Sequence, residues 1–332
     1  MVGMETIKIG VIGVGHLGAS HIRNLQTIKG VELVGFHDID KNRADEISQN
    51  FNTRFYESRS ELLGLVDAVS IVTPTNTHYE IASDAIENRL STFIEKPICY
   101  DPDEARKLVA SAHSNDCVLQ VGHIERFSGT YQALAHTKLN PMFVECHRLM
   151  EFQPRNLDVA VVHDLMIHDI DLVLNMTGSK PTKVDASGVS VITNSVDIAN
   201  ARLTFAGGCV ANLTASRISQ KGMRKMRIFQ TNSYITLDFL KGETLIYVIG
   251  DGGNSEKGKK ISEINLGDKT KEIYLESPTI VGENPLLAEL KAFIHSIRTG
   301  EEPPVTGEDG LAALEVATEI ISAINEGTSD QI

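Results

Sequence analysis

The chain has 332 residues, of which 42% are hydrophobic and 23% charged, so it is long enough for two globular domains. Its formal net charge of −13 argues against general binding of nucleic acids or anionic membranes, and an anionic ligand would need a local basic pocket. No apolar run approaches membrane-spanning length, and we expect neither a signal peptide nor a transit peptide. The cysteines form no C-x-x-C, which predicts reduced thiols in a cytoplasmic protein and no metal site.

The first predicted strand leads into a glycine-rich turn. Residues 8–12 are apolar, and Gly13, Gly15 and Gly18 form a G-x-G-x-x-G that opens a helix expected from Leu17 to about Ile28. A second apolar run ends at Asp38, 20 residues after Gly18, where a dinucleotide-binding fold places its ribose-binding carboxylate. This order of strand, glycine turn, helix, strand and acid predicts dinucleotide binding rather than an ordinary turn.

Each part of this motif has a chemical reason. Gly13 permits the tight turn, Gly15 lets a pyrophosphate approach the backbone, and Gly18 lets the helix pack closely. The helix N-terminus offers free N–H groups to the pyrophosphate. Asp38 would accept ribose hydroxyls and repel a 2′-phosphate, which favours NAD over NADP, although Arg43 could tolerate a phosphate. The cofactor-binding residues expected here are Gly13, Gly15, His16, Leu17, Gly18 and Asp38.

Residues 1–122 alternate predicted strands with predicted helices. This alternation is typical of an α/β fold, a doubly wound, mostly parallel Rossmann sheet with helices on both faces. After Asp38, the expected strands are 68–72, 91–94 and 118–121, and the expected helices are 41–50, 59–64, 79–88 and 102–114.

Residues 123–332 have a different pattern, which predicts a substrate-binding and oligomerisation domain of α+β type. Alternating polarity predicts a large open, mostly antiparallel sheet with one covered face, and Gly207-Gly208 and Lys241-Gly242 predict hairpin turns. Residues 251–260 are polar and Gly-rich and are expected to form a mobile loop. The expected strands are 142–149, 201–205, 210–216, 226–230, 234–238 and 244–248, and the expected helices are 160–176, 285–298 and 311–325.

Two short motifs follow strands of the parallel sheet, at the edge where such folds bind ligands. The first is Thr73-Pro74-Thr75-Asn76-Thr77-His78, which could also be a turn that caps the next helix. The second is Glu95-Lys96-Pro97, in which Lys96 could face a nicotinamide and bind a substrate hydroxyl, or could be a surface lysine before a rigid proline. Lys96–Pro97 is a candidate cis bond.

A third cluster lies on the predicted helix 160–176. Asp164 and His168 are four residues apart and share a face, with Asp171 one turn further along. An aspartate that orients a histidine general base would explain titratable groups on a partly buried helix. A divalent-metal site and a buried salt-linked pair are the alternatives; His163 and His168 diverge, and there is no H-E-x-x-H.

The fourth signal is the segment 217–227, which carries five basic residues and no acidic one in an acidic chain. It could be a hairpin that binds phosphate, a solvated hairpin or an oligomer contact.

Together these motifs resemble the glucose–fructose oxidoreductase/inositol dehydrogenase (Gfo/Idh/MocA) family over essentially the whole chain. The resemblance implies that Lys96, Asp164 and His168 form the catalytic group and that the open sheet joins subunits of a homodimer or homotetramer. It also implies cofactor contacts from Thr73, Pro74, Asn76, His78, Glu95 and Lys96. Many members have a Gly-rich approach to the Asp-x-x-x-His helix, which is here Asp158-Val159-Ala160-Val161-Val162-His163.

That approach, with segments 122–127 and 215–219, is similar to the branch that acts at C3 of UDP-N-acetylglucosamine or its uronic acid. The resemblance therefore implies NAD-dependent oxidation of a sugar's secondary hydroxyl to a ketone. The alternatives are a dehydrogenase of a free sugar or polyol and a non-enzymatic sugar sensor, which would need no acid–base group. The substrate-binding residues implied are Lys96, Arg126, Asp164, His168 and Arg217.

Overall fold

The computed structural model describes residues 6–153, 159–250, 258–267, 269–280 and 282–329. They form two compact units: the first consists of Met1–Phe127 and Glu283–Leu314, and the second of Ser128–Gly282 and Glu315–Ile332. The helix α9 (Gly307–Ser329) contributes residues to each unit.

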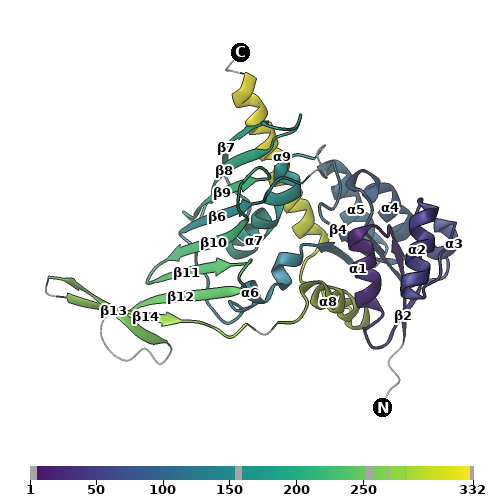
Figure 1. Ribbon diagram of the computed structural model, residues 1–332, viewed down its shortest axis with the longest axis horizontal. Coiled ribbons are helices and arrows are strands. Elements are labelled where there is room, and N and C mark those ends of the chain that lie inside the picture. Colours follow the sequence, from purple (N-terminus) through teal and green to yellow (C-terminus); the bar gives the residue numbers. More distant parts are fainter. Residues whose placement is uncertain (1–5, 154–158, 251–257, 268, 281, 330–332) are drawn as a thin grey trace. The chain divides into compact units, whose positions relative to one another are not determined.

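The first unit contains a five-stranded parallel sheet in the order β2-β1-β3-β4-β5. Figure 1 labels β2 and β4 of this sheet. This doubly wound sheet confirms the predicted α/β fold class. Its strands are β1 (Ile7–Ile12), β2 (Val31–His37), β3 (Ala68–Ile71), β4 (Ser91–Glu95) and β5 (Leu119–Gly122). Its helices are α1 (His16–Leu25), α2 (Lys41–Phe51), α3 (Arg59–Leu63), α4 (His78–Glu87), α5 (Pro102–Ser114), α8 (Pro285–Thr299) and the short 3-10 helices η1 (Thr75–Thr77) and η2 (Ile124–Phe127).

The helix α8 belongs to this first unit, although the expected division at residues 122/123 placed it in the second. Its buried residues Leu290, Phe293 and Ile294 join the core cluster that contains the strand residues Ile9 and Phe93. The rings of Phe93 and Phe293 meet edge to face, 5.8 Å apart. The apolar stripe of a C-terminal helix therefore completes one face of the N-terminal sheet.

The second unit contains a nine-stranded sheet in the order β13-β14-β12-β11-β10-β6-β9-β8-β7, in which the pair β6–β9 is parallel and the other pairs are antiparallel. Its strands are β6 (Phe143–Leu149), β7 (Lys183–Val189), β8 (Ile198–Thr204), β9 (Val210–Ser216), β10 (Met223–Gln230), β11 (Ser233–Asp238), β12 (Glu243–Gly250), β13 (Lys259–Leu266) and β14 (Lys269–Glu276). Its other elements are α6 (Gly129–Gln132), the π-helix η3 (Val162–Met166) and α7 (Ile167–Thr177).

The predicted open antiparallel sheet is thus confirmed, with three strands that the pattern analysis missed: β7, β13 and β14. The strand β7 reads Lys-Val-Asp-Ala-Ser-Gly-Val, which is too polar to be recognised as a strand from its pattern. Within the described residues it is the edge strand next to β8. The strand β13 begins inside the expected loop 251–260, of which residues 251–257 lie outside the described part of the chain.

The basic segment 217–227 is not a hairpin, so that prediction was wrong. The strands β9 and β10 on either side of residues 217–222 do not pair with each other, because β6 lies between them. The two expected hairpin turns are confirmed: Gly208 and Gly242 have positive φ angles of 84° and 64° and connect β8 to β9 and β11 to β12.

One face of the nine-stranded sheet carries α7, which packs on β6 and β9. Arg148 of β6 is only 2% exposed, and its guanidinium donates to the carboxylate of Asp169 on α7 through Nε at 3.1 Å and Nη2 at 2.9 Å. This two-pronged ion pair fastens the helix to the sheet inside the core, where the opposite charges offset part of the cost of burying each other.

Candidate active site

The glycine turn has the shape that a dinucleotide requires. Gly13 has a φ of +87°, and a Cβ there would lie 2.6 Å from the Val72 carbonyl oxygen; a Cβ on Gly18 would lie 2.0 Å from the Gly13 carbonyl oxygen. Larger residues would therefore displace either the turn or α1. A Cβ on Gly15 would meet no atom within 4 Å, so the backbone is open on the side that a pyrophosphate would approach.

Asp38 and Arg43 brace the same turn. The Asp38 carboxylate accepts the N–H of Val14 at 2.7 Å and the N–H of Asp40 at 2.9 Å. Arg43 donates through Nε to the Val14 carbonyl at 2.9 Å and through Nη1 to Glu46 at 2.6 Å. The guanidinium considered above as a binder of a 2′-phosphate is thus bound to the turn and paired with Glu46.

His78 lies beneath the two loops at the carboxyl edge of the parallel sheet. Its Nδ1 is 3.0 Å from the carbonyl oxygen of Pro97, which follows a cis bond, and its Nε2 is 2.9 Å from the carbonyl oxygen of Thr73. Burial lowers the pKa of His78, against the opposing effect of its contacts with the Thr73 and Pro97 carbonyls. His78 therefore ties the two loops together, while Pro74 and Asn76 lie exposed above it.

Sequence reasoning missed His21, a fully buried residue of α1. Its Nδ1 is 2.9 Å from the Ser70 hydroxyl and its Nε2 is 3.1 Å from the Glu95 carboxylate, which also accepts the N–H of Lys96 at 3.2 Å. Burial would raise the pKa of Glu95, but the hydrogen bond from His21 and the nearby charges outweigh it and hold that pKa below its usual value. A buried chain of polar groups thus supports the backbone at Lys96.

Asp164 and His168 lie on one continuous helical segment of the second unit, but its first turn differs from the α-helix that we expected. Residues 162–166 form the π-helix η3, and the α-helix α7 begins at Ile167. Asp164 and His168 are half-buried, whereas the residues between them are buried. A π turn widens the helix locally and is frequent at functional sites.

Lys96 belongs to the first unit, whereas Asp164 and His168 belong to the second. The structure therefore describes Lys96 within one unit and the pair of Asp164 and His168 within the other. Their combination into one catalytic group is part of the proposal below.

The two arginines expected to bind substrate make contacts within their own units. Arg126 is buried and donates through Nη1 to Asp309 and to the Pro304 carbonyl, each at 3.2 Å. Arg217 is buried beside Asp197. In the rest of the basic segment, Lys225 pairs with Asp238 and Arg227 with Glu145. These contacts give no support to a dedicated phosphate site at 217–227.

Across the described ranges, no cluster of three or more His, Cys, Asp or Glu side chains could hold a metal ion. In the same residues, no helix is both long and apolar enough to cross a membrane.

A parallel sheet with an open glycine turn and an acid at the end of its second strand is the architecture of a dinucleotide-binding domain. Residues 7–123 match the model of the "oxidoreductase family, NAD-binding Rossmann fold", and residues 122–236 match that of the "GFO/IDH/MocA C-terminal domain". The chain belongs to the Gfo/Idh/MocA family and is an NAD-binding dehydrogenase, as the motifs predicted.

Among its relatives, a UDP-N-acetylglucosamine 3-dehydrogenase from Acidithiobacillus ferrooxidans is 42% identical over 75% of this chain and 79% of its own. A crystal structure under the same name and from the same organism superposes with a TM-score of 0.87, covering 97% of this chain and 98% of the other. A myo-inositol 2-dehydrogenase from Thermotoga maritima is 27% identical over 93% of each chain. A scyllo-inositol dehydrogenase from Lactobacillus casei, solved with bound NAD(H) and scyllo-inositol, shares the fold at 20% identity and a TM-score of 0.76, covering 97% of this chain and 98% of the other.

The contacts of Asp38 and Arg43 predict a preference for NAD⁺ over NADP⁺ of at least about tenfold in Kd, or ~1.4 kcal/mol. Asp38→Ala should weaken NAD⁺ binding and reduce the ratio of the Kd for NADP⁺ to the Kd for NAD⁺, because the carboxylate that repels a 2′-phosphate is gone. Titration of each variant with both cofactors checks this, with Asp45→Ala, an exposed aspartate of α2, as the control. Tighter binding of NADP⁺ by the unaltered chain would contradict the role given to Asp38.

Proposed function

We propose that the chain oxidises the C3 hydroxyl of UDP-N-acetylglucosamine, or of a closely related UDP-N-acetyl sugar, to a ketone. The observation that carries this proposal is the 42% identity to a UDP-N-acetylglucosamine 3-dehydrogenase, against 27% for the myo-inositol enzyme. The agreement extends to the whole fold, with 35% identity across 97% of the chain in the superposed structure.

In the proposed mechanism, His168 takes the proton of the sugar hydroxyl as general base. Lys96 donates a hydrogen bond to the same oxygen as alkoxide character develops, and Asp164 orients His168 and stabilises its cationic form. NAD⁺, when bound, supplies the hydride acceptor. The His21–Glu95 pair holds the Lys96 backbone, and His78 holds the loops that carry Thr73, Pro74 and Asn76 toward the cofactor.

A panel of substrates tests the function directly. We expect NADH to form with UDP-N-acetylglucosamine or its uronic acid, and little or none with free N-acetylglucosamine or myo-inositol, because the nucleotide contributes much of the binding energy. Better turnover of myo-inositol or a free hexose would contradict the nucleotide-sugar proposal. Ligand binding without turnover across the panel would instead indicate a sensor.

We also propose assembly into a homodimer or homotetramer through the uncovered face of the nine-stranded sheet. Phe143, Phe229, Tyr234 and Tyr247 form a row there, with successive ring centroids 5.8, 4.8 and 5.4 Å apart, and Phe229 is 38% exposed. A contiguous row of aromatic side chains on a sheet face is typical of a protein interface. Light scattering should give the mass of two or four chains, and Tyr234→Glu should reduce that mass. A monomeric mass for the unaltered chain would contradict the proposal.

The free cysteines support a reducing, cytoplasmic location.

A further inference from the structure

We propose that Arg217 and Asp197 are positioning residues that hold the start of the helix carrying Asp164 and His168. This inference rests on the proposed function of that helix, and it replaces the role of substrate contact that the sequence suggested for Arg217. All of the groups involved lie in the second unit.

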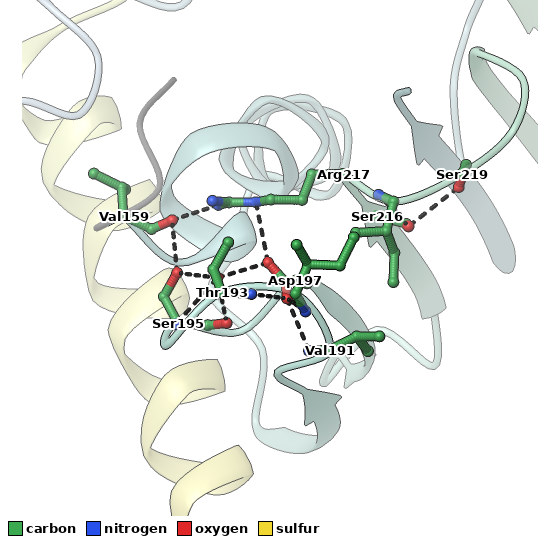
Figure 2. Close-up of polar contacts among 10 residues, drawn as sticks. Val159, Val191, Thr193, Ser195, Asp197, Ser216, Arg217 and Ser219 are labelled. Carbon is green, nitrogen blue, oxygen red and sulfur yellow. Dashed lines mark hydrogen bonds and ion pairs between the residues drawn. The ribbon is translucent and has the colours of Figure 1, made fainter. Parts of the chain in front are cut away.

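The Asp197 carboxylate organises the turn between β7 and β8, as Figure 2 shows. Its Oδ2 accepts the backbone N–H groups of Val191, Ile192 and Thr193 at 2.8, 2.7 and 2.9 Å, and its Oδ1 accepts the Thr193 hydroxyl at 2.7 Å. Burial would raise the pKa of Asp197, but these hydrogen bonds lower it to about 2, so the side chain is a fully buried anion.

Arg217 provides the matching cation and a second contact. Its Nε lies 4.0 Å from Asp197 Oδ1, and its side chain is only 7% exposed. Its Nη2 donates to the carbonyl oxygen of Val159, so the guanidinium faces both Val159 and Asp197 (Figure 2). A planar guanidinium can satisfy both groups at once, whereas a lysine ammonium is a single point charge.

The contact at Val159 leads directly into the catalytic helix. The N–H of Val161 donates to the Val196 carbonyl at 2.9 Å, beside Asp197, and the Ala160 carbonyl accepts the N–H of Asp164 at 3.1 Å. Val159 and Val161, the residues on either side of Ala160, are thus each held by a hydrogen bond, about one helical turn before Asp164. This anchoring sets where the π turn begins and therefore how Asp164 is presented to His168.

A loosened helix start should reduce catalysis more than binding, because an acid–base group displaced by about 1 Å loses much of its effect. We expect Arg217→Lys to lower kcat at least about tenfold while the KM for the sugar changes less than about threefold. The acidic limb of the pH profile should move to lower pH, because Asp164 stabilises the protonated His168 less well. Asp197→Asn should behave similarly.

The control is Arg227→Lys, which alters an exposed ion pair with Glu145 on the same sheet and should leave kcat and the pH profile unchanged. A raised KM at unchanged kcat in Arg217→Lys would overturn the inference and restore Arg217 as a substrate contact. An unchanged kcat and pH profile would also overturn it.

Amide hydrogen exchange tests the anchoring without reference to activity. In Arg217→Lys, exchange should accelerate at residues 161–168 and stay unchanged at β1–β5 of the first unit. Unchanged exchange at 161–168 would overturn the inference even if turnover fell. If the unaltered chain oxidises no sugar, the proposed function fails, but accelerated exchange would still support the role of Arg217 as an anchor.

Discussion

Replacement of His168 or Lys96 by alanine is expected to lower turnover of the nucleotide sugar at least about a hundredfold, the usual scale for a lost acid–base group. In the proposed mechanism, His168 removes a proton from an alcohol that ionises only at high pH, and Lys96 stabilises the oxygen as its charge develops. The loss should fall on kcat, because each group acts mainly in the transition state. Initial rates at saturating NAD⁺ and sugar measure it.

A control is offered by His113, an exposed histidine at the C-terminal end of α5, away from the carboxyl edge of the parallel sheet. Because its side chain points into solvent, His113→Ala should change turnover less than tenfold, or less than about 1.4 kcal/mol. Binding of NADH, followed by its fluorescence, should persist in His168→Ala. Near-normal turnover in His168→Ala or Lys96→Ala would remove that residue from the mechanism.

Breaking the ion pair between Arg148 and Asp169 is expected to have the largest effect on stability. Arg148→Met leaves the Asp169 carboxylate buried without its partner, and such a loss costs about 3–5 kcal/mol in unfolding free energy. Asp169→Asn should also destabilise the protein, because the guanidinium of Arg148 then loses the carboxylate that accepts from its Nε and Nη2. Urea denaturation followed by circular dichroism measures both effects.

The double variant Arg148→Met/Asp169→Leu separates the pair's net contribution from the penalty of an unpaired charge. It should be more stable than Arg148→Met alone, because position 169 no longer carries a charge into the core. The exposed pair Lys41–Glu57 is the matched control, and Glu57→Ala should change stability by less than ~1 kcal/mol. A single Arg148→Met variant as stable as the unaltered chain would refute the claim that the pair fastens α7 to the sheet.

Local sequence was sufficient for the first half of the fold. The order of apolar runs, glycines and acid up to Asp38 predicts a strand, turn, helix and strand, and the structure has β1, α1 and β2 at those places. The roles of Gly13 and Gly18 can be predicted from the sequence, because steric contacts with the nearby backbone exclude larger residues at these positions. The same holds for the spacing of Asp164 and His168, which one helical segment carries.

Contacts between distant residues were not readable from the sequence. Nothing near His21 indicates that its partner is Glu95, 74 residues later, and a lone histidine among apolar neighbours is most often a satisfied core residue. The basic segment 217–227 looked like a phosphate site because charge was counted along the chain. Folding places Asp197, Asp238 and Glu145 against three of its basic side chains.

The sequence by itself determined the dinucleotide turn, the parallel sheet, the open antiparallel sheet and the helix of Asp164 and His168, because short-range sterics and periodicity specify these features. Only the tertiary structure decided that β6 separates β9 from β10, that α8 completes the first unit's core, and that Arg217 neutralises Asp197. Strand order, helix docking and charge pairing depend on which surfaces meet after folding. These contacts join residues that are tens to hundreds of positions apart in the sequence, so no local sequence pattern predicts them.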